Sequence, residues 1–149
     1  MITIHSDENF MREALKQADM ALMDKEIPVG AVIVCNKRII ARAYNQTEKL
    51  VDSTAHAEML ALTAAFNYLG AKYLPECTLY VTLEPCGMCA GALFWSQIGK
   101  LVFAAEDPKR GFSQINPGLL HPKTKVVQGI LAEDSKQILD KFFYSIRNK

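Results

Sequence analysis

Long apolar runs are missing from this sequence of 149 residues. No stretch approaches the roughly 20 apolar residues that a membrane-spanning helix needs. The first ten residues, MITIHSDENF, also lack the basic start and apolar centre of an export signal. We therefore expect no membrane span and, by default, a location in the cytoplasm.

An excess of positive or negative charge is missing too, because the formal net charge is only +1. A strongly basic composition is typical of many nucleic-acid-binding domains. Its absence removes the simplest argument for an RNA partner. A near-neutral net charge is still compatible with a local basic patch. Internal repeats, low-complexity tracts and long linkers are absent as well. Because a chain of this length, half of it hydrophobic, can bury a substantial core, one domain over residues 1–149 is expected.

Cysteine is scarce, with four residues at Cys35, Cys77, Cys86 and Cys89. An even number would suggest disulfides in a small exported protein, but no export signal is found here. Cys86 and Cys89 form a C-x-x-C pair. That spacing indicates a metal site or a redox pair rather than a disulfide framework.

Hydrophobic periodicity and turn residues predict strands that alternate with helices. The predicted helices cover residues 9–23, 54–68, 85–98 and 133–146. The predicted strands cover residues 29–35, 38–44, 77–82, 100–105 and 125–128. This order favours an α/β layered domain with a mostly parallel sheet. Residues 106–123, which contain many glycines and prolines, are expected to form a long and therefore functional loop.

Cap and turn residues set the expected boundaries of these elements. Asp7 is the predicted N-cap of the first helix, and Ser53 or Thr54 caps the second. Gly70 is expected to end the second helix. Residues 36–37, Asn-Lys, form the tight turn of a predicted hairpin.

Two short motifs are expected at the starts of helices. They are His56-Ala57-Glu58 and Pro85-Cys86-Gly87-Met88-Cys89. Each is weak alone, because His-Ala-Glu arises by chance in many helices and C-x-x-C also occurs in redox pairs, structural zinc sites and buried thiol pairs. Their coincidence in this order, after a strand and helix pattern, strongly favours one shared metal site.

Zinc is the metal that suits these side chains, because it takes nitrogen and sulfur ligands in a tetrahedron. Cys86 and Cys89 are three residues apart, so both sulfurs face one side of a first helical turn, where the helix dipole favours thiolates. His56 would supply a third ligand. His5 and His121, in a terminus and a loop, are not convincing fourth ligands. Three protein ligands with one open position are typical of a catalytic zinc, and one Zn²⁺ per chain is predicted.

Glu58 has two possible explanations. It follows His56 by two residues, so it does not share that side chain's direction on a regular helix, and Ala55 makes it a poor capping-box partner. It could be a solvated helix carboxylate. Beside a zinc site, the favoured interpretation is a general acid and base that moves protons without binding the metal.

The sequence resembles the cytidine deaminase-like superfamily, whose signature is H-x-E followed by P-C-x-x-C. Within it, the likeness to bacterial tRNA-specific adenosine deaminases, which convert the anticodon wobble adenosine to inosine, spans nearly the whole chain. It is carried by residues 26–32, 45, 54–58, 79–86, 88–92, 129–133 and 142–143. The resemblance implies a three-layer α/β/α fold around a central five-stranded mixed sheet.

The resemblance also implies which residues surround the substrate base. They are Asn45, Pro28, Val29, Gly30, Ala57, Leu83 and Glu84. Asn45 could instead simply make the turn that follows a strand. A base held in a pocket has to be recognised through hydrogen bonds to its edge, which favours the pocket role.

Two departures from the family pattern bear on the substrate. The small Gly-Ser stretch expected after the D-x-K-x-G element at 107–111 is replaced by Phe112-Ser113, and residues 93–95, Leu-Phe-Trp, resemble bacterial guanine deaminases. A deaminase of free guanine or cytosine is therefore the alternative function. An alternative of another class, a non-catalytic zinc-stabilised binding module, is disfavoured because it has no use for Glu58.

Cationic and aromatic side chains suit unpaired RNA, since cations contact phosphates and rings stack on bases. The candidates in the long loop and the last helix are Lys109, Arg110, His121, Lys141, Phe143 and Arg147. A tRNA anticodon stem-loop is the expected partner, with a free nucleobase as the alternative. Residues 88–95 are apolar almost all round, which indicates burial on several sides and, with the resemblance, a homodimer.

Overall fold

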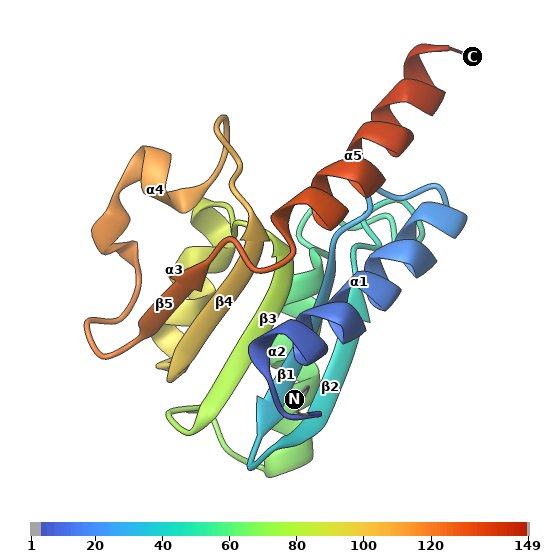
Figure 1. The fold of residues 1–149 in the computed structure, drawn as a ribbon. Helices are drawn as coiled ribbons and strands as arrows, with labels where there is room; N and C mark the ends of the chain where they lie inside the picture. Colours follow the sequence, from blue (N-terminus) through green and yellow to red (C-terminus); the bar gives the residue numbers. More distant parts are fainter. Residues whose placement is uncertain (1–3, 149) are drawn as a thin grey trace.

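A five-stranded sheet forms the centre of the molecule in the computed structural model, which describes residues 4–148. Residues 1–3 and 149, the ends of the predicted domain, lie outside the described residues. The strands are β1 (Gly30–Cys35), β2 (Arg38–Tyr44), β3 (Cys77–Leu83), β4 (Lys100–Ala105) and β5 (Lys125–Gln128). Their order across the sheet is β2-β1-β3-β4-β5 (Figure 1).

The sheet is mixed. β1 pairs antiparallel with both β2 and β3, whereas β3–β4 and β4–β5 are parallel. The mixed five-stranded sheet implied by the resemblance is confirmed, and the mostly parallel sheet expected from element order is wrong. The hairpin explains part of the difference, since Asn36 and Lys37 both have positive φ (51° and 65°), the backbone that joins antiparallel strands.

Helices cover both faces of the sheet. They are α1 (Asp7–Met23), α2 (Ala57–Leu69), α3 (Gly87–Ser96), the short α4 (Phe112–Ile115) and α5 (Ala132–Arg147), with a 3₁₀ turn at Pro117–Leu119. α1 and α5 lie on one face and α2 and α3 on the other, which confirms the three-layer fold (Figure 1). Among residues 4–148, none of the helices has both the length and the apolar composition needed to span a membrane.

Side chains that alternate between the two faces of each strand form two hydrophobic cores, one on each face of the sheet. In β1, Ala31 and Ile33 belong to the core on the side of α2 and α3, while Val32 and Val34 belong to the core on the side of α1. This period of two is what a strand buried on both faces requires. The sheet is therefore held rigidly between the layers, which makes its edges a fixed platform for the loops that follow each strand.

Several predicted helix boundaries were wrong, among them the start of α3, which is Gly87 rather than Pro85. Ser6, not Asp7, is the N-cap of α1, and its hydroxyl accepts a hydrogen bond from the Asn9 amide at 3.0 Å. α2 begins at Ala57, not after Ser53 or Thr54. Residues 52–55 form a turn instead, because Asp52 accepts hydrogen bonds from the amide and hydroxyl of Thr54, both at 2.8 Å.

Candidate active site

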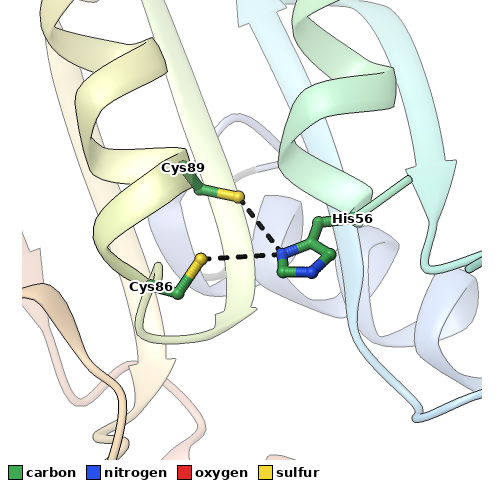
Figure 2. A group of neighbouring side chains, drawn as sticks. All are labelled: His56, Cys86 and Cys89. Carbon is green, nitrogen blue, oxygen red and sulfur yellow. Dashed lines mark hydrogen bonds between the residues drawn. The ribbon is translucent and has the colours of Figure 1, made fainter. Parts of the chain in front are cut away.

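The N-termini of α2 and α3 bring the two sequence motifs together. His56 is the N-cap of α2, with extended backbone (φ −72°, ψ 153°), and Cys86 is the N-cap of α3 (φ −72°, ψ 176°). Cys89 lies in the first turn of α3. The side chains of His56, Cys86 and Cys89 turn toward one another across the gap between the helices (Figure 2).

The distances among these three side chains fit a zinc ion. His56 Nδ1 lies 3.6 Å from Cys86 Sγ and 3.5 Å from Cys89 Sγ, and the three ligand atoms lie within 4.8 Å of one another. Tetrahedral zinc, with bonds of about 2.3 Å to sulfur and about 2.0 Å to nitrogen, separates such atoms by about 3.5 Å. The group could therefore hold one metal ion with little rearrangement.

The three side chains of the group differ in their pKa values. The hydrogen bond from Cys89, with a smaller contribution from His56, lowers the pKa of the Cys86 thiol to about 4. The same bond, together with burial, raises the pKa of Cys89. The hydrogen bond with Cys86 raises the pKa of His56. Negative charge is thus concentrated on Cys86, as expected for a thiolate at a helix N-terminus.

Glu58 lies in the first turn of α2 and is only 4% exposed. Burial raises the pKa of its carboxyl group to about 7, and the negative charge of the nearby Cys86 thiolate acts in the same direction. The solvated-carboxylate interpretation is therefore excluded. A buried carboxyl group that gains and loses its proton near neutral pH suits general acid and base chemistry.

Asn45 lies directly after β2, next to the segment that leads into His56. Its side-chain amide donates to the Ile27 carbonyl at 3.3 Å, and its backbone amide donates to Val29 at 3.0 Å. The next residue, Gln46, donates to Ala55 at 3.0 Å. Asn45 is 6% exposed, and within residues 4–148 its Oδ1 atom has no hydrogen-bond partner.

The other predicted base-pocket residues are buried or half-buried. Pro28, Val29 and Gly30 are buried beside Asn45, and the buried Ala57 stands between His56 and Glu58. A Cβ atom on Gly30 would overlap with the Ala14 carbonyl, so this glycine lets α1 approach β1. Leu83 is half-buried and packs against the core on the side of α2 and α3.

The Glu84 carboxylate holds the loop at residues 106–113. Oε1 accepts a hydrogen bond from the Asp107 amide at 3.1 Å, and Oε2 accepts from the Ser113 amide at 3.1 Å and the Ser113 hydroxyl at 2.6 Å. Sequence reasoning missed both Asp107 and Ser113. The available signal was a carboxylate at the end of an apolar strand, which needs hydrogen-bond donors when it is buried.

The candidate RNA contacts fall into two separate groups. Lys109 and Arg110 are exposed in the loop that pairs with Cys86 through Gly111. His121 packs against Phe94 of α3, with ring centroids 5.8 Å apart. The remaining candidates lie on α5, on the other face of the sheet, and are Lys141, Phe143 and Arg147.

Comparisons with known proteins agree with this geometry. Residues 4–105 match the family described as the cytidine and deoxycytidylate deaminase zinc-binding region. The chain therefore belongs to this family of zinc-binding deaminases, and it is an enzyme of the same hydrolytic class.

Individual relatives within the family give a more specific similarity than the family model does. The chain is 47% identical over 148 residues to the tRNA-specific adenosine deaminase of Bacillus subtilis strain 168, covering 96% of this chain and 92% of that protein. A solved structure from work on A-to-I editing by tRNA:A34 deaminases superposes with a TM-score of 0.82 at 41% identity, covering 87% of this chain and 98% of that one. The guanine deaminase of Bacillus subtilis superposes with a TM-score of 0.66 at 36% identity, covering 77% and 71% of the two chains.

Proposed function

We propose that this chain hydrolyses the wobble adenosine of a tRNA anticodon loop to inosine and ammonia. The observation that carries the proposal is the 47% identity to a tRNA-specific adenosine deaminase over nearly the whole chain. The geometry adds the chemistry, because a buried carboxyl group stands beside a His, Cys, Cys group of zinc-binding dimensions.

His56, Cys86 and Cys89 are the proposed zinc ligands. Zinc held there would lower the pKa of a water molecule and so supply the nucleophile for the amino-bearing carbon of the base. The thiolate character of Cys86 favours metal binding, because thiolates rather than thiols are the ligands.

Glu58 is the proposed proton carrier. Its carboxylate accepts a proton from the attacking water and delivers that proton to N1 of the adenine ring. A further proton passes through the same carboxyl group to the departing amino group, which leaves as ammonia. Its pKa near 7 allows it to serve as base and then as acid at neutral pH.

Asn45 is the residue proposed to recognise the base by hydrogen bonding. Leaving a buried hydrogen-bond acceptor without a donor costs about 1–3 kcal/mol of stability, so such an acceptor is expected to gain a donor when substrate is bound. Oδ1 of Asn45 is such an acceptor within the described residues 4–148. We propose that it accepts a hydrogen bond from the flipped-out nucleoside, and that Pro28, Val29, Gly30, Ala57 and Leu83 surround the base.

RNA binding is assigned to exposed cations and rings. An anticodon loop presents unpaired bases, so one base is drawn into a closed site at less cost than from a duplex. Lys109 and Arg110 directly precede Gly111, which forms a backbone bridge with Cys86, and His121 lies against Phe94 of α3. We propose that these residues, together with Lys141, Phe143 and Arg147, contact the nucleotides that flank the target adenosine.

We also propose a homodimer in the cytoplasm. The observation behind the dimer is the face of α3 turned away from the sheet, where Trp95 is 75% exposed and Met88 is 38% exposed. Exposed aromatic and methionine side chains are enriched at protein interfaces. Light scattering at micromolar concentration tests the dimer, and a monomer there would refute it.

The decisive experiment offers several substrates to the zinc-loaded protein. Ammonia release is measured with an anticodon stem-loop, free guanine, free cytosine and free adenine, and inosine is identified in the RNA product. We expect inosine only in the stem-loop, with a KM that rises steeply with salt because phosphate contacts release counterions.

Free guanine is the second candidate substrate, on the strength of the structural likeness to a guanine deaminase. Efficient deamination of guanine without inosine in the stem-loop would replace tRNA by guanine as the substrate. Such a result would leave the proposed roles of His56, Cys86, Cys89 and Glu58 intact.

A further inference from the structure

Glu84 is a buried carboxylate between two functional segments of the chain. It is 3% exposed and stands two residues before Cys86. Within residues 4–148, its three hydrogen bonds all go to the segment that follows β4, through Asp107 and Ser113. A charged group in such a position is stabilised only by well-placed donors, so the loop and the carboxylate hold each other in place.

Backbone contacts join the same two segments. The Phe112 amide donates to the Pro85 carbonyl at 2.9 Å, and Cys86 and Gly111 form an isolated antiparallel bridge. A Cβ atom on Gly111 would overlap with the carboxyl group of Glu84. The loop therefore lies directly on the turn that carries a proposed zinc ligand.

The rest of the loop shows why this attachment matters. Asp107 Oδ1 accepts hydrogen bonds from the amides of Lys109 and Arg110, at 3.1 and 3.0 Å, and so shapes a tight turn. That turn carries two exposed cations, and Glu84 holds the Asp107 amide at its start. Releasing Glu84 would leave the cations on a loop that is no longer fixed relative to the zinc site.

We propose that Glu84 is a positioning residue for RNA. Its carboxylate fixes the loop at residues 106–113 against the zinc-ligand turn, so that Lys109 and Arg110 meet the anticodon backbone in one place. This role, which rests on the proposed function, differs from direct contact with the base, because in the described part of the chain the three hydrogen bonds of the carboxylate go to the loop.

The test uses Glu84→Gln in the zinc-loaded protein, because glutamine keeps the size but replaces one acceptor oxygen with a donor. We expect KM for an anticodon stem-loop to rise roughly tenfold, the effect of losing one charge-assisted hydrogen bond, while kcat changes less than about threefold. Zinc content stays at one per chain. Amide hydrogen exchange at Asp107 and Ser113 becomes faster.

Asp7→Asn is the matched control for a general loss of stability. Asp7 accepts hydrogen bonds from the Tyr80 hydroxyl at 2.7 Å and from Lys100 at 3.0 Å, on the α1 side of the sheet. This variant should lower the melting temperature without changing the KM for RNA or the exchange of the two loop amides. If both variants shift KM alike, the effect of Glu84 is merely structural and the proposal fails.

Gly111→Ala keeps the proposal testable if Glu84→Gln does not fold. The added methyl group displaces the loop from an intact carboxylate, so the rise in KM and the faster exchange should recur. Unchanged exchange at Asp107 and Ser113 in either folded variant would refute the positioning role. Failure of the wild-type protein to form inosine would refute the proposed tRNA substrate instead, and the exchange measurement would still decide whether Glu84 fixes the loop.

Discussion

At the proposed zinc centre the ligand side chains and Glu58 are buried or half-buried, whereas the candidate RNA contacts on α5, Lys141, Phe143 and Arg147, are exposed. Glu58 and Cys89 are almost fully covered, and both belong to first turns of helices packed on the sheet. Along α5, Ser135 and Phe142 are the residues buried, and the helix extends beyond the sheet (Figure 1). Chemistry at a metal requires groups held at set distances, while contact with a flexible, charged RNA tolerates mobile side chains.

The largest effect is expected at the metal ligands. Cys86→Ser removes a thiolate from a three-ligand set, so zinc and deaminase activity should both be lost and the melting temperature should fall. Metal analysis, thermal melting and ammonia release measure this. Cys35→Ser is the control, since Cys35 is a half-buried cysteine at the far end of β1 and should keep zinc and activity. A fully metallated, active Cys86→Ser protein would contradict the ligand assignment.

The second largest effect is expected for a Glu58 variant, which should lose catalytic rate without losing zinc. Glu58→Ala should keep its fold and its zinc but lose roughly 10²–10⁴-fold in kcat, the usual contribution of general acid and base catalysis. Single-turnover kinetics with an anticodon stem-loop and metal analysis of the same sample test this. Substantial residual turnover at one zinc per chain would remove Glu58 from its proposed role.

Acid should weaken zinc binding, because protons and metal compete for the same atoms. Before zinc binds, Cys89 is a thiol near neutral pH because its pKa is raised, and Cys86 is already a thiolate. Zinc binding must displace the Cys89 proton and, wherever the imidazole is protonated, the His56 proton, so zinc affinity should rise by at least about tenfold per pH unit. Calorimetry in two buffers of different ionisation enthalpy should show the release of at least about one proton. Proton release near zero would contradict this assignment of charge.

The smallest effect is expected on α5. Lys141→Ala with Arg147→Ala should raise KM for the stem-loop by roughly tenfold or less and reduce the salt slope, because each lost phosphate contact removes about 0.7 from that slope on single strands. Zinc content and kcat should not change. Lys136→Ala, on an exposed residue of the same helix outside the proposed contacts, is the control. Equal salt slopes for the wild type and the double variant would exclude α5 from the RNA surface.

Segments with a clear hydrophobic period were predictable from the sequence, and the residues at which helices begin were less predictable. The strands at 38–44, 100–105 and 125–128 match the observed β2, β4 and β5, since alternating or continuously apolar runs bounded by turns leave little choice. The start of α2 was missed because Thr54 has the right chemistry for a cap, yet Asp52 holds it in a turn. Local competition between two nearby hydrogen-bonding side chains is not visible in hydrophobic periodicity.

By itself, the sequence determined the residue types and spacing of the proposed zinc centre, because metal ligation and proton transfer depend on chemistry that few side chains possess. Only the tertiary structure decided how those groups meet. It placed His56 and Cys86 at N-caps rather than inside helices, buried Glu58 so that its pKa rises, and turned Glu84 toward the loop at 106–113. These features depend on contacts between segments distant in the chain, and burial and hydrogen bonding across such distances follow from packing rather than from local pattern.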